Sequence, residues 1–400
     1  MSSETRDLTE NSAGCFPASD TLTERAAGDA NLIAAAERIG ATVLGPNATD
    51  SDLSDGPNRV NFAALAEAGL LGMALPTEYG GRNASGEAQK AITEIFASYC
   101  GVTTFTQAQH HGPSRMILNG PNEELKKRLL PDLAAGRALC AVSFAHLRRP
   151  GPPVLRAEPI PGGWRLFGTA PWVTGYGLMN QCVFGATRPD GRHVYLWSPF
   201  DRSEFADLFE AVSGPLKSDW GTLSASPPLP LCAMNASATA ELTLDGWFIP
   251  AAHWLSESDR ETMRTNDRNN ILGAAPMPLG CAKASVRLLC ETGERRGILT
   301  VAKAAESLRS EWTELKAASE YWSGKAREPE GFAKALEMRA WCIEFASRAA
   351  LAAVAASSGG ANSLRHPAQR LLRESLFYTI QAQTQEVMEA TLERLTSKRL

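Results

Sequence analysis

Hydrophobic and polar positions follow three successive patterns along the 400-residue chain. Apolar residues first recur at helical spacing, over residues 22–44, 61–68, 85–99 and 122–135. Short apolar runs bounded by Gly, Pro, Asp and Asn follow, and they predict strands at 163–168, 181–186, 193–198 and 240–250. Helical spacing then returns over 271–294, 303–322, 330–355 and 367–395. The order helices, strands, helices predicts an α+β protein.

The three patterns predict a multi-domain organisation, since 400 residues exceed the usual size of one core. Residues 1–20 are polar and are expected to form a mobile tail. An N-terminal α-helical domain is expected over 21–137, a middle antiparallel, β-barrel-like domain over 138–255, and a C-terminal four-helix bundle over 256–400.

Composition narrows the possible partners and compartment. The chain is 44% hydrophobic and 21% charged with a net charge of −4, which is typical of a soluble globular protein and gives no indication of a nucleic-acid partner. The most apolar run, 349–356, is shorter than a membrane span, so no membrane partner is expected. Eight cysteines without a CxxC pair or zinc-like spacing indicate free thiols, no metal site and a cytoplasmic location.

Trp172 and Thr174 form the first candidate for a chemical site. In an extended segment, residues two apart share one face, so the indole of Trp172 could cover a flavin ring while Thr174 hydrogen-bonds its edge. The structural alternative is a half-buried Trp and a surface Thr on an ordinary strand.

Several short motifs occur in an order that resembles one known family. They are Gly69-Leu70-Leu71-Gly72 with Glu78-Tyr79-Gly80-Gly81, Trp172-Val173-Thr174, the strand-like 238–250, Gly359-Gly360, His366-Pro367, Arg373-Glu374 and Thr384. With the helix–strand–helix order, they resemble the acyl-CoA dehydrogenase superfamily of flavoproteins from about residue 20 to residue 395.

The resemblance implies that FAD binds between the middle and C-terminal domains and reaches across a dimer interface. It implies contacts of Trp172, Thr174 and Thr384 with the cofactor, and it places Arg295, next to Arg296, near the FAD phosphates. Gly359 and Gly360 lack side chains, so their amides at a helix start could approach a diphosphate. Their structural alternative is a helix-to-helix turn. A homodimer or homotetramer is expected.

The chain departs from the family where a dehydrogenase keeps its carboxylate base. One family position falls at Ala382, in Gln381-Ala382-Gln383-Thr384, and a methyl group cannot accept a proton. The other falls at or near Asn270, and an amide is no base either. Asp267 lies nearby, but a shift of two or three positions turns a helical side chain elsewhere.

Histidines stand near the expected cleft instead. The loop that many members have as Thr-Glu-Pro reads Ala145-His146-Leu147 here, which puts binding of a standard acyl-CoA in doubt. His110, His111, His146 and Ser143 are therefore candidate catalytic residues, since some monooxygenases of this fold use histidines and a serine around the flavin. For each one, a satisfied polar residue is the structural alternative.

Three hypotheses follow. The first is an FAD-dependent oxidoreductase that dehydrogenates a small-molecule or carrier-bound acyl substrate with a non-standard base and passes the electrons to an acceptor that the sequence leaves open. The second is a flavin-dependent monooxygenase that uses reduced flavin and O2. The third is a non-catalytic binding subunit of an oligomer.

Overall fold

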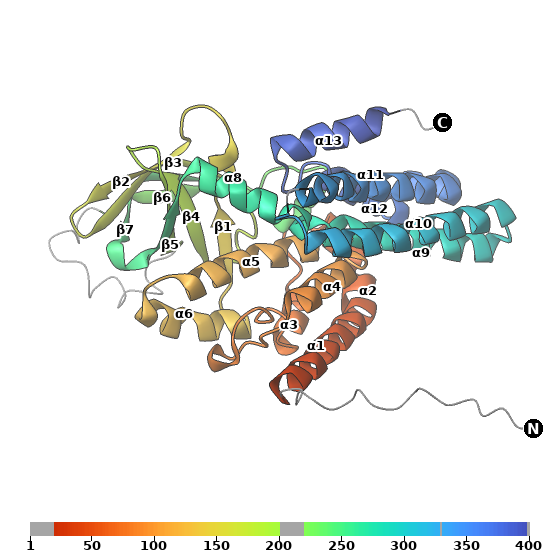
Figure 1. The fold of residues 1–400 in the computed structure, drawn as a ribbon, viewed down its shortest axis with the longest axis horizontal. Coiled ribbons are helices and arrows are strands. Elements are labelled where there is room, and N and C mark those ends of the chain that lie inside the picture. Colours follow the sequence, from red (N-terminus) through yellow and green to blue (C-terminus); the bar gives the residue numbers. More distant parts are fainter. Residues whose placement is uncertain (1–19, 201–219, 329, 398–400) are drawn as a thin grey trace, which may run out of the picture.

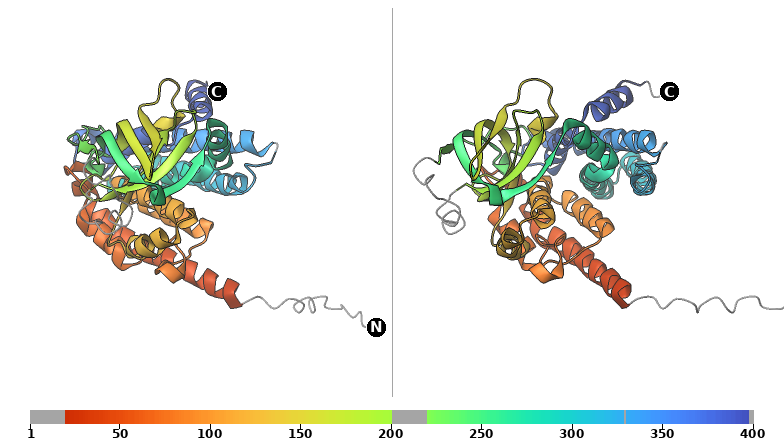
Figure 2. Two further views of the ribbon diagram at one scale, coloured as in Figure 1. Left: turned by 90° about the vertical axis from the view of Figure 1, so that its left-hand side faces the viewer. Right: turned by 60° about the vertical axis from the view of Figure 1, so that its left-hand side comes forward.

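A computed structural model describes residues 20–200, 220–328 and 330–397 of the chain. The tail expected at 1–20 lies, but for its last residue, outside this described part, as does Cys15. Figure 1 shows the predicted order of helices, strands and helices, which is confirmed. The β domain lies at one end and the C-terminal bundle at the other, and the N-terminal helices lie alongside both of them, as the views in Figure 2 also show.

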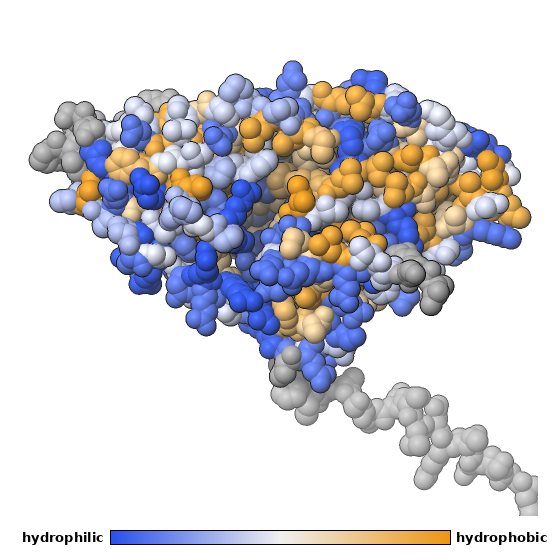
Figure 3. Space-filling view, turned by 90° about the horizontal axis from the view of Figure 1, so that it is seen from above, coloured by the Kyte–Doolittle hydropathy of each residue, from blue (hydrophilic) through white to orange (hydrophobic). Residues whose placement is uncertain are grey.

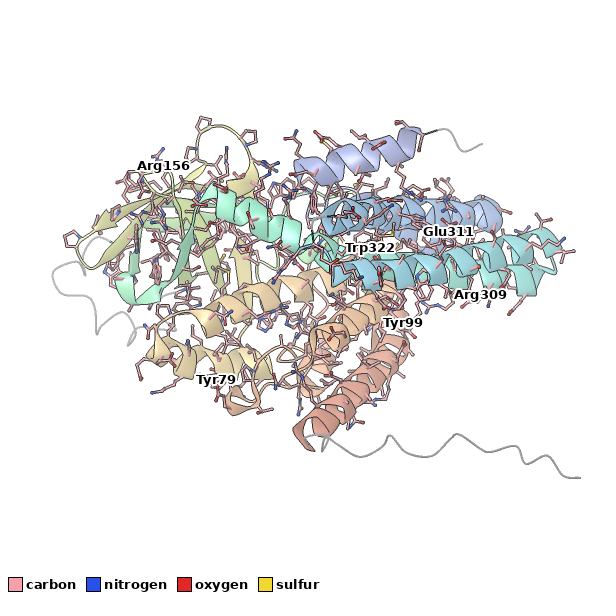
Figure 4. All side chains as sticks on the ribbon, viewed as in Figure 1. Tyr79, Tyr99, Arg156, Arg309, Glu311 and Trp322 are labelled. Carbon is pink, nitrogen blue, oxygen red and sulfur yellow. The ribbon has the colours of Figure 1, made fainter. Side chains whose placement is uncertain are left out.

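The N-terminal part is helical. Its helices are α1 (Asp20–Ile39), α2 (Gly45–Leu53), α3 (Arg59–Glu67), α4 (Gly86–Ala97), α5 (Gly101–Asn119) and α6 (Glu123–Ala135). Side-chain caps begin several of them; the Asn58 side chain, for example, accepts from two amides of α3. Between α1 and α2 a π-helical turn, Gly40–Leu44, passes so close to the ring of Tyr99 that a β-carbon at Gly40 would overlap it (Figure 4).

The helix α5 was not among the predicted elements, although it spans 19 residues. Its sequence is rich in Thr, Gln and His and contains Gly112 and Pro113, so it has no continuous apolar stripe. The helix is enclosed instead: most of its residues are buried, polar ones included. It lies between the β domain and the bundle, because it contacts β1 (Cys140–Ser143) and because Phe105 packs edge-on against Phe377 at 4.6 Å.

The middle part is one eight-stranded sheet. Besides β1, its strands are β2 (Leu155–Ile160), β3 (Gly163–Val173), β4 (Gln181–Thr187), β5 (His193–Pro199), β6 (Thr222–Ala225), β7 (Ala240–Pro250) and β8 (Trp254–Ser258). The order is β6-β7-β3-β2-β4-β5-β8, with β1 beside β4. Most pairs are antiparallel, as predicted, whereas β1 and β2 run parallel to β4.

The register explains why both β1 and β2 pair with β4. The strand β1 pairs along Gln181 to Phe184, and β2 touches β4 only at Thr187, so the two strands succeed one another along the same edge. On its other side β2 pairs with β3 as far as Gly168, and β3 continues beyond it to Val173. The last part of β3 therefore runs beside β1, which it contacts.

The C-terminal part consists of α8 (Arg260–Asn269), α9 (Pro276–Arg296), α10 (Leu299–Ser323), α11 (Gly331–Ser357), α12 (Pro367–Tyr378) and α13 (Gln385–Thr396). The single helix predicted over 367–395 is wrong, because the chain leaves helical geometry at 379–384. Ala382 there has a left-handed φ of 50°, and the Thr384 hydroxyl accepts from the Val387 amide to begin α13.

One segment, Gly331–Asn362, has the length and hydropathy of a membrane span. Half of its most apolar window is buried inside the protein, where α11 packs against α9, α10 and α12. It is the core helix of the bundle, and its apolar character follows from contact with helices on several sides.

Candidate functional site

Trp172 occupies a strained position at the end of β3. Its φ is 61°, a region that bulky residues rarely adopt, and the pairing of β3 with β7 shifts register between Ala170 and Val173. The indole is 44% exposed, whereas Thr174 is buried. The expectation that these two side chains share one face is therefore wrong, because the segment is not extended at Trp172. Strain of this kind concentrates at functional sites.

Thr174 belongs to a chain of buried hydroxyl groups. Its Oγ1 lies 3.1 Å from Oγ1 of Thr239, which in turn lies 2.8 Å from Oγ of Ser237. The backbone adds a bond, since the Gly175 amide donates to the Ser237 carbonyl at 2.8 Å. These contacts fix the turn that follows Trp172 and thereby hold the indole in position.

Ser143 is the last residue of β1, the strand that the second half of β3 contacts. Its side chain is 2% exposed, and its hydroxyl has no hydrogen-bond partner in the described part of the chain. An unpaired buried hydroxyl costs about 1–3 kcal/mol. Ser143, Trp172 and Thr174 thus belong to neighbouring segments of the sheet and offer an aromatic face and two hydroxyl groups, a set of groups that fits the ring and polar edge of a flavin.

His110 is a satisfied polar residue, which was the structural alternative to a catalytic role. Its Nδ1 accepts from the Cys140 amide at 3.2 Å, and its Nε2 lies 3.1 Å from the Leu133 carbonyl, to which it must donate. Both ring nitrogens are thus used, and burial lowers the pKa of His110 to about 4. The neutral ring joins α5 to β1, and no nitrogen remains for a substrate.

His111 and His146 each retain one unused ring nitrogen. The Nε2 atom of His111 and the Nδ1 atom of His146 are buried and have no partner among the described residues. Nε2 of His146 lies 3.0 Å from the Gly185 carbonyl and must donate, so Nδ1 carries a lone pair. Burial lowers the pKa of His146 to about 4 and that of His111 well below its usual value. Both rings are neutral at pH 7.

Neither family base position carries a free carboxylate. Ala382 lies in the exposed 379–384 loop, and Asn270 ends α8. Asp267 is held by a bidentate ion pair, in which Nε and Nη2 of Arg148 each lie 2.7 Å from one carboxylate oxygen. Both lone-pair systems of Asp267 are engaged, so it is a poor base.

Three of the other predicted cofactor residues, Arg295, Gly359 and Gly360, lie at the ends of α9 and α11 that are remote from the β domain (Figure 1). Gly359 and Gly360 occupy a 3-10 turn, Ser358–Asn362, after the C-terminus of α11, so their expected place at a helix start is wrong. A β-carbon at Gly359 would meet nothing within 4 Å, so the turn is open to solvent. Arg296, rather than Arg295, reaches this turn, donating to the Ala356 carbonyl at 2.8 Å and to the Ser358 hydroxyl at 3.0 Å.

A cavity of about 230 Å³ lies between α3 and the segment that follows β3. It contains none of the predicted site residues. Its lining residues include Arg59, Phe62, Leu71, Arg137, Leu139 and Leu178. Among residues 20–200, 220–328 and 330–397, no group of three His, Cys, Asp or Glu side chains is placed to hold a metal ion.

Comparison with known proteins assigns the fold. Residues 29–137 match the family model of the N-terminal domain of acyl-CoA dehydrogenases. Butyryl-CoA dehydrogenase of Megasphaera elsdenii superimposes with a TM-score of 0.73 over 96% of this chain and 100% of its own, at 17% identity. The chain belongs to the acyl-CoA dehydrogenase superfamily. The family resemblance seen in the sequence is therefore confirmed.

Curated relatives within the superfamily cover only part of the chain. A probable acyl-CoA dehydrogenase of Mycobacterium leprae is 31% identical over 37% of this chain and 39% of its own length. A 3-sulfinopropanoyl-CoA desulfinase of Paraburkholderia xenovorans is 27% identical over 39% and 42%. The chain thus matches about two fifths of the length of these relatives.

Two further solved structures share the fold. A glutaryl-CoA dehydrogenase of Mycobacterium smegmatis in complex with FADH2 has a TM-score of 0.72 at 18% identity, covering 92% of this chain and 95% of its own. A dibenzothiophene monooxygenase of Paenibacillus sp. A11-2 has a TM-score of 0.72 at 14% identity, covering 92% and 97%. The same fold thus occurs in proteins named for two different reactions.

Proposed function

We propose that this protein is an FAD-dependent oxidoreductase of the acyl-CoA dehydrogenase type that acts on an acyl thioester without the usual carboxylate base. The observation that carries the proposal is Trp172, a strained and exposed indole at the end of β3, with the buried hydroxyl groups of Thr174 in the following turn and of Ser143 on the neighbouring strand β1. A large aromatic side chain held out of its strand at a conformational cost supports a binding role.

Each residue of this set would have a distinct part. The indole of Trp172 would cover one face of the flavin, and the hydroxyl groups of Thr174 and Ser143 would hydrogen-bond its polar edge. FAD, when bound, supplies the hydride acceptor. Nδ1 of His146 carries a lone pair and would accept a hydrogen bond from an N–H or O–H group of the substrate, while Nε2 of His111, in the tautomer that protonates it, would donate to a carbonyl. Neither ring would be the base, because neutral rings with a strongly lowered pKa are weak proton acceptors at pH 7.

A titration with FAD tests the proposal. The purified protein is mixed with FAD, freed of excess and examined by visible absorbance. Trp172→Ala is expected to weaken FAD affinity at least tenfold, whereas Trp164→Ala, at the other end of the same strand, is expected to leave it within twofold. A wild-type protein that retains no FAD would contradict the proposal, and equal affinities of the two variants would remove Trp172 from the site.

Monooxygenation is the second candidate. It is favoured by Ala382 at the base position, by the two neutral histidines, and by the fold shared with dibenzothiophene monooxygenase. Mixing the FAD-loaded protein anaerobically with butyryl-CoA separates the candidates. Bleaching of the flavin supports dehydrogenation. Monooxygenation is supported if butyryl-CoA does not bleach the flavin and if the chemically reduced protein takes up O2 only when a substrate is present.

The cofactor proposal requires a second copy of the chain. The 27 residues of α11 extend about 40 Å at 1.5 Å per residue, and the Gly359–Gly360 turn lies at the end remote from the β domain (Figure 1). Figure 3 shows apolar side chains gathered over the bundle. Its helices α11 to α13 and their connecting loops expose Leu351, Leu364, Leu376, Ile380, Met388, Leu392 and Leu395.

We therefore propose a homodimer or homotetramer in which the partner's diglycine turn approaches the diphosphate. The surface just described is where apolar area would be removed from water. Leu351→Lys with Leu392→Lys is expected to give monomers in light-scattering measurements, while Val60→Lys, an exposed apolar position on α3, is expected to leave the oligomer intact. A wild-type monomer would contradict this part of the proposal.

A further inference from the structure

Arg339 on α11 is a buried arginine that has no carboxylate partner among the described residues. Its side chain is 0% exposed. One guanidinium nitrogen, Nη2, donates to the backbone carbonyl of Gln381 at 3.0 Å, while Nη1 has no partner in the described part of the chain. Burial lowers the pKa of Arg339 to about 10, so the side chain remains charged at neutral pH.

The neighbouring arginines of the bundle are neutralised. Arg370, also buried, lies 2.6 Å from the Glu374 carboxylate. Arg348, two and a half turns further along α11, pairs with Glu344 at 3.0 Å and with Glu311 of α10, which is labelled in Figure 4. Arg339 therefore differs from these other two arginines of the bundle, because its charge is not neutralised.

Packing alone does not explain this charge. A buried charge without a counter-charge costs several kcal/mol, and a Met or Leu side chain would fill a similar volume at a lower cost. The nearby Cys342 does not compensate, because burial raises the pKa of its thiol to about 11 and keeps it neutral at pH 7. The arginine is thus kept at the expense of stability.

What Arg339 holds is the loop between α12 and α13. Its bond ends on the carbonyl of Gln381, directly before Ala382, whose left-handed φ of 50° costs about 1–2 kcal/mol relative to ordinary helical geometry. Within the described part of the chain, the other hydrogen bonds of the loop are local, between residues at most four positions apart, such as the one from the side-chain amide of Gln383 to the Thr379 carbonyl at 2.9 Å. Figure 1 places this loop at the end of the bundle that faces the β domain.

We infer that Arg339 is a positioning residue, which fixes the 379–384 loop through a charged hydrogen bond to Gln381 and places an unneutralised positive charge behind this loop. A charged donor strengthens the bond to a carbonyl roughly twofold over a neutral one. The inference rests on the proposed function in one respect: it takes the flavin to lie beside this loop, between the bundle and the β domain.

Hydrogen exchange of the flavin-free protein tests the positioning. In Arg339→Met, amides of residues 380–384 are expected to exchange at least tenfold faster than in the wild type. Arg339→Gln, which keeps a donor without the charge, is expected to be intermediate, and Arg339→Lys close to the wild type. The melting temperature of Arg339→Met is expected to be equal or higher, because a buried charge has been removed.

Arg365→Met is the matched control, since Arg365 lies in the connection before α12 and its ion pair with Asp50 is exposed at both ends. It is expected to change neither exchange in the loop nor melting. Unchanged loop exchange in Arg339→Met would overturn the inference. A lower melting temperature with faster exchange throughout the bundle would equally overturn it, because the role would then be structural.

The charge of Arg339 is tested separately, through the midpoint potential of FAD bound to the protein. Positive charge beside a flavin stabilises its reduced, more negative form. The midpoint potential of the bound FAD is therefore expected to fall in Arg339→Met and to be retained in Arg339→Lys; equal potentials would overturn the electrostatic part of the inference. If the wild type binds no FAD, the proposed function fails, whereas the exchange experiment still decides the positioning of the loop.

Discussion

The carboxylate of Glu374 on α12 accepts a hydrogen bond from the backbone N–H of Gly101, the first residue of α5, at 3.2 Å. The same carboxylate pairs with Arg370 at 2.6 Å. Glu374 thus places negative charge at the N-terminus of α5, where the helix dipole favours it. This contact joins the helix that carries His110 and His111 to the C-terminal bundle.

Gly101→Ala is expected to disrupt this contact between α5 and α12. A β-carbon at Gly101 would lie 2.6 Å from Cδ of Glu374, so the carboxylate or the helix would have to move. Overpacking of this kind costs about 1–3 kcal/mol of unfolding free energy. Urea denaturation followed by circular dichroism measures it.

Gly112→Ala on the same helix is the control for Gly101→Ala. A β-carbon there meets nothing within 4 Å, and alanine in a helix interior is favoured over glycine by about 0.5–1 kcal/mol. The two substitutions should therefore change stability in opposite directions. Equal destabilisation of both would show that the close approach to Glu374 is not what restricts residue 101.

Trp172→Gly should be more stable than Trp172→Ala. Both variants lose the indole, but only glycine adopts the φ of 61° without the roughly 1–2 kcal/mol that a left-handed conformation costs other residues. At Trp164, on the same strand and outside the left-handed region, the order should reverse, because glycine weakens an ordinary strand position. Thermal melts of the four flavin-free variants check this, and the same order at both sites would remove the strain argument.

Stability should fall steeply in acid because His110 and His146 are buried as neutral rings. The folded pKa of each, about 4, lies below the ordinary 6.5, so the folded state binds fewer protons. Their contribution is complete above about pH 6.5 and is lost as the pH falls through 4. For each ring it is on the order of 3 kcal/mol.

His110→Gln tests this pH dependence, because the amide supplies one donor and one acceptor but does not titrate. The variant should lose less stability than the wild type between pH 7 and pH 4, while at pH 8 the two should agree within about 2 kcal/mol. Denaturant titrations at several pH values give the slopes. Parallel slopes would mean that His110 is not the group whose protonation opposes folding.

Periodicity predicted those elements that have one apolar face. The strand at 240–250 and the bundle helices were found because their buried positions recur at the spacing of strands or helices. The helix α5 was missed because it is enclosed on most sides and carries Thr, Gln and His on buried positions. The sequence therefore suggested His110 and His111 but gave no element to place them on.

The candidate site residues likewise divide into those that the sequence indicated and those that it did not. Trp172 and Thr174 were proposed as site residues through a family motif, yet their relative orientation depends on a left-handed turn that no alternation of residues reveals. Arg339 was missed, although a single arginine between Met338 and Ala340 in an apolar helix is a visible signal. Its partner, a backbone carbonyl 42 residues away, exists only in the folded chain.

Ala382→Glu would return a carboxylate to the family's base position, and the loop geometry makes the change feasible. Ala382 is exposed and already left-handed, so the backbone strain is present before the substitution and a longer side chain adds no burial cost. If the cleft accommodates an acyl-CoA, bleaching of bound FAD by butyryl-CoA should become at least tenfold faster and should rise with pH through the carboxylate's titration.

Ala382→Gln, which has nearly the same shape but no proton-accepting carboxylate, is the control and should bleach no faster than the wild type. Because the Arg339 guanidinium holds the neighbouring carbonyl of Gln381, its positive charge should lower the pKa of the introduced acid, and adding Arg339→Met should shift the pH profile upward. Faster bleaching in the Gln variant would show that the missing carboxylate is not what slows the wild type. No bleaching in the Glu variant with FAD bound would do the same. Either result would place the cause of slow bleaching in the rebuilt substrate loop around His146.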